Sequence, residues 1–153
     1  MTRRIGEQQL RTWRGFITAH ATLIEQIDQE LLTAQCIPLH WYDVLVELHE
    51  APEHRLRMSE LARRVVLSRS TLTHLASRLE HAELLFRQRV DMDRRGAYAV
   101  LTEQGQIALQ KAWPIYAQGI QQYFLDHLSN EEIAVIDTIF QRILGLQAAP
   151  PTP

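Results

Sequence analysis

The chain has 153 residues, of which 46 % are hydrophobic and 22 % charged, with a formal net charge of −2 at pH 7. This composition excludes disordered and fibrous proteins and is ordinary for a globular domain. No apolar run approaches the roughly 20 residues that cross a bilayer, and the first residues do not form an export signal, so we expect a cytoplasmic protein that makes no membrane contact.

The first predicted element is a long helix over residues 7–33. Its apolar residues follow the spacing of one helical face, and they are Leu10, Trp13, Ile17, Ile24, Ile27 and Leu31. Such a helix reaches roughly 40 Å at about 1.5 Å per residue, which is too long for a domain of this size to cover. We therefore expect a second copy of the chain to cover its apolar stripe.

A second helix is predicted between Pro38 and Pro52, with Trp41, Val44, Leu45 and Leu48 on its inner face. Two short helices separated by a turn follow it, and Ser59 and Ser68 are their expected N-caps. This arrangement is typical of a helix-turn-helix. In its second helix, the apolar residues Leu72, Leu75, Ala76 and Leu79 share one face, whereas Ser70, Thr73, His74 and Ser77 share the other.

The next segment predicts a two-stranded hairpin, with strands at residues 84–90 and 97–101 and Gly96 in the turn. A helix capped by Thr102 is expected to run to about His127, and a capping box at residues 129–132 starts the last helix. The tail at residues 148–153 is expected to be disordered.

Arginine is concentrated around the predicted helix-turn-helix and hairpin. Residues 55–95 contain ten arginines and five acids, a net charge of +5, whereas the rest of the chain carries −7. Neutralisation of phosphates drives binding to nucleic acids, so this middle segment is expected to approach a polyanion.

Five short segments stand in a characteristic order: LRMSELA at 56–62, LSRSTLT at 67–73, RLE at 78–80, DRRG at 93–96 and LTEQG at 101–105. Their order and spacing resemble the MarR family of bacterial transcriptional regulators. The resemblance implies a mainly α fold with a small β-hairpin wing. Residues 55–101 would form a winged helix-turn-helix, and residues 1–50 and 102–147 would form a helical dimerisation region.

Glu83 departs from the family pattern, which has glycine after the recognition helix. Glycine suits a left-handed helix terminus, and another residue held there costs on the order of 1 kcal/mol. We expect the local exit from the helix to be affected and the fold to be kept.

The resemblance implies a sequence-specific DNA-binding regulator, a repressor released by a small-molecule effector, that binds a pseudo-palindromic operator as a homodimer. Its recognition helix would enter the major groove and its wing the adjacent minor groove, where short polar side chains and arginines suit close approach. The candidate DNA contacts are Ser68, Arg69, Ser70, Thr71, Thr73, His74, Arg78, Asp93, Arg94 and Arg95. Arg55, Arg57, Arg63 and Arg64 are interpreted mainly as surface charge. Arg87 and Arg89 are interpreted either as residues of a solvated strand face or as phosphate contacts.

The effector implied by the resemblance is a small aromatic or anionic molecule bound between the dimerisation region and the winged unit. The candidate lining residues combine aromatic surface with a few polar tips, and they are Trp13, Phe16, His20, Trp41, Tyr42 and Trp113. The alternative for each aromatic residue is a place in the core or in the dimer interface.

Three other functions stay open at this point. Cys36 is the only cysteine and would make a redox sensor only with a lowered pKa, which the expected C-terminal end of the first helix disfavours. A winged fold can also serve as a protein-interaction module without DNA binding. No catalytic motif, metal-ligand spacing or cofactor motif is present, so we expect no enzyme, no metal and no cofactor.

Overall fold

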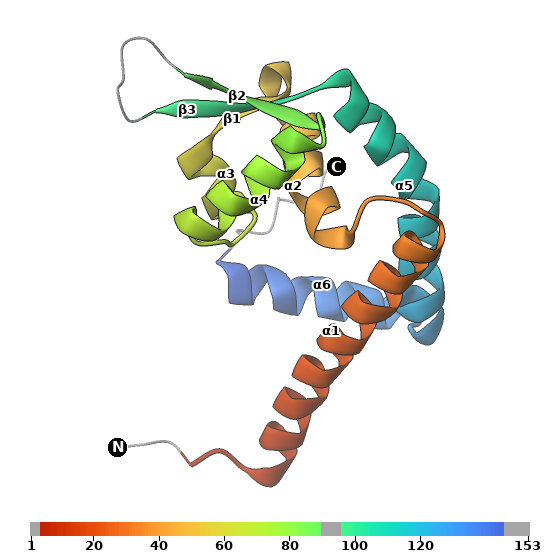
Figure 1. Ribbon diagram of the computed structural model, residues 1–153. Helices are drawn as coiled ribbons and strands as arrows, with labels where there is room; N and C mark the ends of the chain where they lie inside the picture. The colour runs from red at the N-terminus through yellow and green to blue at the C-terminus, as the bar shows by residue number, and fades with distance from the viewer. Residues whose placement is uncertain (1–3, 90–95, 146–153) are drawn as a thin grey trace, which may run out of the picture.

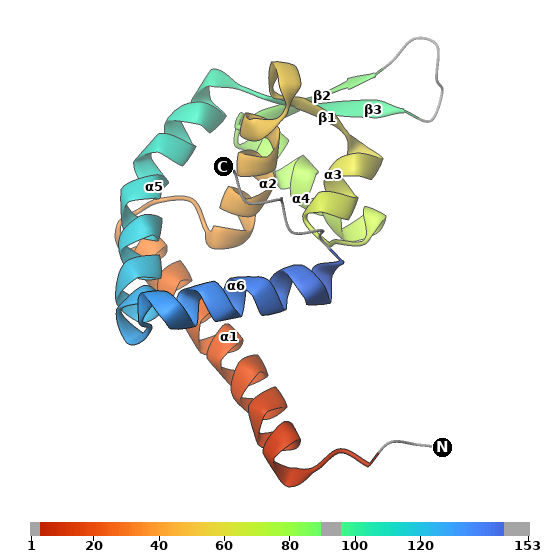
Figure 2. The same ribbon diagram turned by 180° about the vertical axis from the view of Figure 1, so that it is seen from behind.

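The computed structural model describes residues 4–89 and 96–145 (Figure 1). The elements, in order, are α1 (Glu7–Thr33), α2 (Leu39–Glu50), the 3₁₀ turn η1 (Pro52–His54), β1 (Arg55–Arg57), α3 (Met58–Arg64), α4 (Arg69–His81), β2 (Leu85–Arg89), β3 (Ala97–Leu101), α5 (Glu103–Tyr123), the 3₁₀ turn η2 (Leu125–His127) and α6 (Asn130–Leu144). Figures 1 and 2 show the small sheet at one end, α5 along one side, and α1 and α6 at the opposite end. None of the helices in the described ranges has the length and apolar character of a membrane span.

The predicted long helix is confirmed as α1. Its C-terminal half packs against α5 through Ile27 and Leu31, which are buried. Its N-terminal half projects away from the rest of the chain (Figure 1), and residues 4–22 are all exposed. The exposed residues of this half include Trp13 and Phe16, so a large apolar stripe is left uncovered within one chain.

The core is built around α2, where Val44, Leu45 and Leu48 are completely buried. This helix packs on α5 at one side and on α3, β1 and β3 at the other. It therefore joins the long outer helices to the small sheet and the two short helices beneath it.

The helix-turn-helix forms from α3 and α4, as predicted, but one cap was wrong. The helix α3 begins at Met58 and its N-cap is Arg57 without a side-chain hydrogen bond, because the short strand β1 runs directly into the helix. Ser68 does cap α4, where its hydroxyl accepts a hydrogen bond from the N–H of Thr71 at 3.2 Å.

The hairpin is confirmed, and β1 adds a third strand that the sequence analysis missed. The antiparallel order is β1-β3-β2, with Leu56 opposite Ala99 and Arg87 also opposite Ala99 on the other side. Three residues are too short a run to show the alternation by which a strand is recognised.

Thr102 connects the exit of α4, the last strand and α5. Its backbone N–H donates to the Leu84 carbonyl at 3.2 Å, and its hydroxyl donates to the Glu83 carbonyl at 2.7 Å. The same hydroxyl accepts from the N–H of Gly105 at 3.0 Å and so caps α5. Glu83 has φ 60°, so it takes the left-handed conformation that suits glycine, and the change expected at the exit from the helix is not seen.

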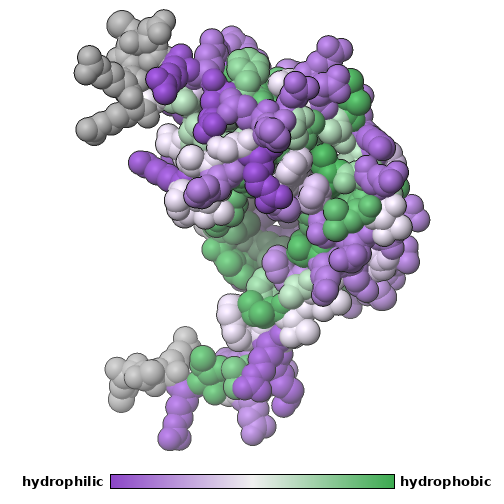
Figure 3. Space-filling model, in the orientation of Figure 1, coloured by the Kyte–Doolittle hydropathy of each residue, from purple (hydrophilic) through white to green (hydrophobic). Residues whose placement is uncertain are grey.

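The end of α5 differs from the prediction. The helix stops at Tyr123, and η2 follows as a separate turn before the predicted capping box, which is confirmed at Ser129 and Glu132. The last helix, α6, has no buried residue and exposes Val135, Ile143 and Leu144. Figure 3 shows hydrophobic surface within the hollow between the upper part of the molecule and the projecting α1.

Candidate nucleic-acid interface

The helix α4 has one buried face and one exposed polar face. Its buried side chains are Leu72, Leu75, Ala76 and Leu79, as predicted. Ser70, Thr73, His74 and Ser77 lie exposed on the other side. Thr73 and Ser77 donate their hydroxyls to carbonyls one turn earlier, at 2.8 and 3.0 Å, which keeps these side chains close to the helix. The side chains of the exposed face are therefore short and close to the helix backbone, and none of them is acidic.

At the start of α4, three hydroxyl groups form a compact cluster. The Ser68 hydroxyl lies 3.1 Å from that of Ser70 and 2.7 Å from that of Thr71. Arg69 is exposed beside them. An arginine and short hydroxyl side chains at a helix N-terminus suit contact with a phosphate, because the free backbone N–H groups add partial positive charge.

A surface cavity of about 560 Å³ lies beside α3 and the start of α4. Three arginines line it, Arg57, Arg63 and Arg69, together with one carboxylate, Glu60. The sequence analysis proposed Arg69 and interpreted Arg57 and Arg63 mainly as surface charge. Their convergence depends on the angle between the two helices, which the spacing along the chain does not reveal.

Other arginines of the basic segment are held by contacts within the chain. Arg55 and Arg57 lie 5.3 and 5.5 Å from the centre of the Tyr98 ring. Arg55 also pairs with Glu53, and Arg64 pairs with Glu60 at 2.8 Å. Part of the positive charge of this segment therefore supports the winged unit itself.

Arg87 is bound to Glu80, which joins β2 to α4. The Glu80 carboxylate accepts the backbone N–H of Arg87 at 2.9 Å and its guanidinium at 2.9 and 2.6 Å. These bonds, from the backbone first and the side chain second, lower the pKa of Glu80. Arg87 is thus part of an internal ion pair, and the interpretation as a solvated strand residue was wrong.

Arg78, in the last turn of α4, lies 5.6 Å from the centre of the Trp41 ring in α2. The Trp41 indole nitrogen is buried and has no hydrogen-bond partner in the described part of the chain. Desolvation lowers the pKa of the neighbouring His40; Asp28 opposes this shift and Arg78 adds to it. The predicted DNA contact Arg78 is therefore already engaged with the helix behind α4.

The predicted wing contacts Asp93, Arg94 and Arg95 lie outside the described residues. The strands that lead to and from them end at Arg89 and begin at Ala97. Their role in DNA binding stays a prediction.

The six predicted effector residues lie in three places. The rings of Trp13, Phe16 and His20 follow one another along α1 in tilted geometry, and the ring centre of Phe16 also lies 6.2 Å from that of Phe140 in α6. Trp41 lies against Arg78, and Tyr42 and Trp113 both line a cavity between α2 and α5. The structure does not bring all six into one pocket.

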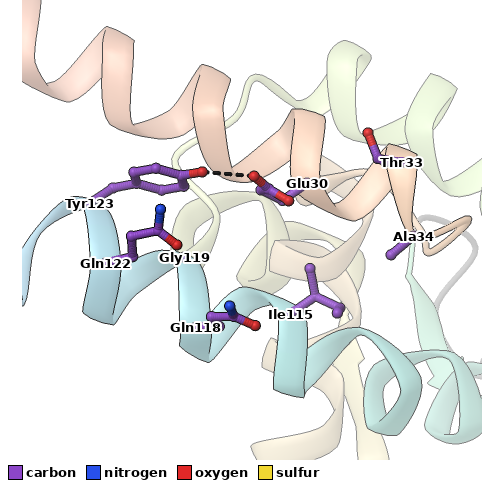
Figure 4. Close-up of a pocket in the computed structure, with 8 residues that line it drawn as sticks. All are labelled: Glu30, Thr33, Ala34, Ile115, Gln118, Gly119, Gln122 and Tyr123. Atoms are coloured by element: carbon purple, nitrogen blue, oxygen red, sulfur yellow. Dashed lines mark hydrogen bonds between the residues drawn. The ribbon is translucent and has the colours of Figure 1, made fainter.

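Another cavity, of about 220 Å³, lies between α1 and α5 (Figure 4). The Tyr123 hydroxyl donates to Glu30 at 2.7 Å across it, and this bond raises the pKa of Tyr123.

Within the described ranges, no three His, Cys, Asp or Glu side chains converge on a position that could hold a metal ion. Cys36 is half-buried, with its sulfur 3.7 Å from the Lys111 carbonyl.

Comparison with known proteins places these features in a family. The model of the MarR family matches residues 37–96. The HTH-type transcriptional regulator MhqR of Bacillus subtilis is 30 % identical over 91 residues, which span 60 % of this chain and 61 % of MhqR. This alignment therefore covers less than two thirds of that relative.

Two solved structures from Streptomyces coelicolor match over nearly their whole length. AbsC, a MarR family transcriptional regulator, is 31 % identical, with a TM-score of 0.85 over 94 % of this chain and 97 % of AbsC. Sco3205, a MarR family regulator solved in complex with DNA, is also 31 % identical, with a TM-score of 0.88 over 97 % of this chain and 94 % of Sco3205.

Proposed function

The chain belongs to the MarR family of transcriptional regulators, and on this premise we propose that it binds a specific DNA sequence through α4. The observation that carries the proposal is the exposed, acid-free face of α4 beside the arginine-lined cavity at its N-terminus. The complex of Sco3205 with DNA supports it by similarity. In this proposal residues 55–101 form the DNA-binding unit, with Arg69, Ser70, Thr73 and His74 facing the bases.

The chain acts as a homodimer through residues 1–50 and 102–147 in this proposal. The support is the apolar surface that α1 and α6 leave uncovered, including Trp13, Ile17, Ile143 and Leu144. Two DNA-binding units related by a two-fold axis fit half-sites about one helical turn apart, roughly 34–36 Å. The operator is therefore a pseudo-palindrome.

We further propose that the protein is a repressor released by a small aromatic molecule. The cavity between α2 and α5 supports this, because α2 packs on the winged unit and α5 continues from its last strand. A ligand there changes DNA affinity only to the extent that it binds one arrangement of the two helices more tightly than the other.

The test of DNA binding begins with selection of a binding sequence from a random duplex library. Affinity is then measured by fluorescence anisotropy for the wild type, Arg69→Ala and, as the matched control, Arg64→Ala. We expect Arg69→Ala to weaken binding by about tenfold, since a good arginine contact contributes roughly 1–3 kcal/mol. Arg64 is already paired with Glu60, so Arg64→Ala has a smaller effect.

The salt dependence of the same titration separates DNA binding from the alternative of a protein-interaction module. Affinity that falls steeply with salt supports release of counterions from DNA phosphates. If no sequence is enriched and affinity does not respond to salt, the proposed function is wrong.

A further inference from the structure

The cavity between α2 and α5 has a distinctive chemical composition. Its volume is about 350 Å³, within the usual range of ligand pockets of about 300–1,000 Å³. The lining residues come from the two helices, and they are Tyr42, Val46, His49, Glu50, Gln106, Leu109, Gln110 and Trp113. The set contains the rings of Tyr42, Trp113 and His49, one carboxylate and no lysine or arginine.

The aromatic part of the cavity is held in place by a further ring behind it. The ring centre of Tyr116 lies 4.8 Å from that of Tyr42 and 6.3 Å from that of Trp113, both in edge-on geometry. Tyr42 is buried, whereas Trp113 is 53 % exposed. The indole of Trp113 is therefore a fixed aromatic surface that a ligand can cover.

Carboxylates give α2 a negative charge, and one of them, Glu50, lines the cavity beside His49. The helix α2 carries three carboxylates, Asp43, Glu47 and Glu50, and no lysine or arginine. Glu47 lies 3.6 Å from Arg64. In residues 4–89 and 96–145, neither Asp43 nor Glu50 makes an ion pair or a side-chain hydrogen bond.

The titration of the neighbouring groups is consistent with this negative field. Burial raises the pKa of Tyr42, and Tyr116, Asp43 and Glu50 add to the shift, in that order. Burial and Asp43 likewise raise the pKa of Tyr116. Both tyrosines therefore keep their protons at neutral pH and stay available as hydrogen-bonding groups.

A carboxylate that shares a cavity with an exposed indole suits an organic cation, because the ring face and the carboxylate both attract positive charge. The same combination repels an anion. We propose that this cavity binds a small aromatic amine in its protonated form, with the ammonium group at Glu50 and the aromatic ring against Trp113. This inference rests on the proposed ligand-responsive function and selects the charge of the ligand.

The test uses three probes of nearly equal size and different charge: 2-phenylethylamine, 2-phenylethanol and phenylacetate. Binding to the full chain at pH 7 is measured by isothermal titration calorimetry, with no DNA present. We expect the amine to bind at least tenfold more tightly than the alcohol, and phenylacetate to bind most weakly. Equal affinity for amine and alcohol, or a preference for phenylacetate, would overturn the proposal.

Variants locate the site. Glu50→Gln is expected to weaken the amine about tenfold and to leave the alcohol unchanged, whereas the matched control Glu25→Gln on α1 changes neither. Trp113→Leu is expected to weaken both amine and alcohol, and Trp113→Phe to restore most of the binding. If Glu50→Gln, with an unchanged circular dichroism spectrum, binds the amine like the wild type, the assignment of Glu50 is wrong.

DNA affinity is measured separately by anisotropy without ligand. A chain that binds DNA but no amine contradicts only this inference. A chain that binds the amine but no DNA contradicts only the proposed function.

Discussion

Two glycines of the chain lie where a neighbouring backbone or helix approaches too closely for a side chain. A Cβ on Gly105 would lie 2.2 Å from the Leu84 carbonyl oxygen, and one on Gly119 would lie 2.9 Å from the Ile27 side chain. Gly105 is the glycine of the LTEQG segment, so this contact gives a physical reason for that part of the family motif. Gly15, in contrast, has no atom within 4 Å of an added Cβ.

These distances predict an order of stability for three alanine substitutions, measured by urea unfolding. Gly105→Ala is the most destabilising, by about 2 kcal/mol or more, because a backbone atom must move. Gly119→Ala costs about 1 kcal/mol, because the Ile27 side chain can give way.

Gly15→Ala is the matched control for these variants and is expected to stabilise the helix by up to about 1 kcal/mol through its higher helix propensity. A destabilisation by Gly15→Ala equal to that of Gly105→Ala would contradict the steric explanation.

At the scale of single residues, the sequence predicted which side chains are buried or exposed better than it predicted which side chains contact one another. The alternation of buried and exposed positions in α4 was predictable, because it depends only on helical periodicity. The pairing of Arg87 with Glu80 was not, because it joins a helix to a strand across a turn whose geometry the sequence does not specify.

At the scale of the elements, the Glu80–Arg87 pair fixes the hairpin to α4. The pKa of Glu80 is lowered in the folded chain, so the pair stabilises fully above the unfolded value of about 4.3. This contribution is lost as the pH falls through the lowered folded value. The two side chains are 32 % and 34 % exposed, and solvent therefore weakens the pair.

We expect Glu80→Gln to reduce the free energy of unfolding by about 1 kcal/mol at pH 7, after allowance for solvent. Because the wild-type carboxyl is itself protonated in strong acid, the difference between the two proteins is lost as the pH falls through the lowered pKa of Glu80. Urea unfolding at a series of pH values measures this difference.

The control for this prediction is Glu60→Gln, which removes the exposed pair with Arg64 within α3 and is expected to have a smaller effect, because solvent screens that pair. A difference between Glu80→Gln and the wild type that persists unchanged in acid would show that the carboxylate charge is not responsible.

The elements themselves were largely predictable from the sequence. The helical spacing of apolar residues predicted the long helices. The predicted caps Ser68, Thr102 and Ser129 are the N-caps of α4, α5 and α6 in the structure. The strand β1 and the break after Tyr123 were missed, because both are set by packing over a few residues. The predicted effector residues lie in three places because periodicity within one helix does not show which helices face one another.

At the scale of the whole molecule, the uncovered apolar surface of α1 and α6 predicts the state of assembly. Trp13 is 59 % and Ile143 73 % exposed within one chain. The double variant Trp13→Asp/Ile143→Asp would bury two unpaired charges in the proposed interface, which is strongly unfavourable. We expect light scattering after size exclusion to give a dimer for the wild type and a monomer for this variant.

The control for assembly is Val66→Asp, which places a charge on an exposed apolar residue of the turn between α3 and α4. This variant is expected to stay dimeric. A wild-type chain that is monomeric at tens of micromolar, or a double variant that stays dimeric, would contradict the proposed dimer.

Thr102 has a mechanical consequence. Its hydrogen bonds to Leu84, Glu83 and Gly105 join the start of α5 to the last strand and to the exit of α4. The 21 residues of α5 make a rod about 31 Å long at about 1.5 Å per residue. A tilt of α5 by a few degrees at Thr102 would move the far end of the helix by a few ångströms. A small rotation of the winged unit would therefore correspond to a larger displacement of the outer helices that pack on the end of α5.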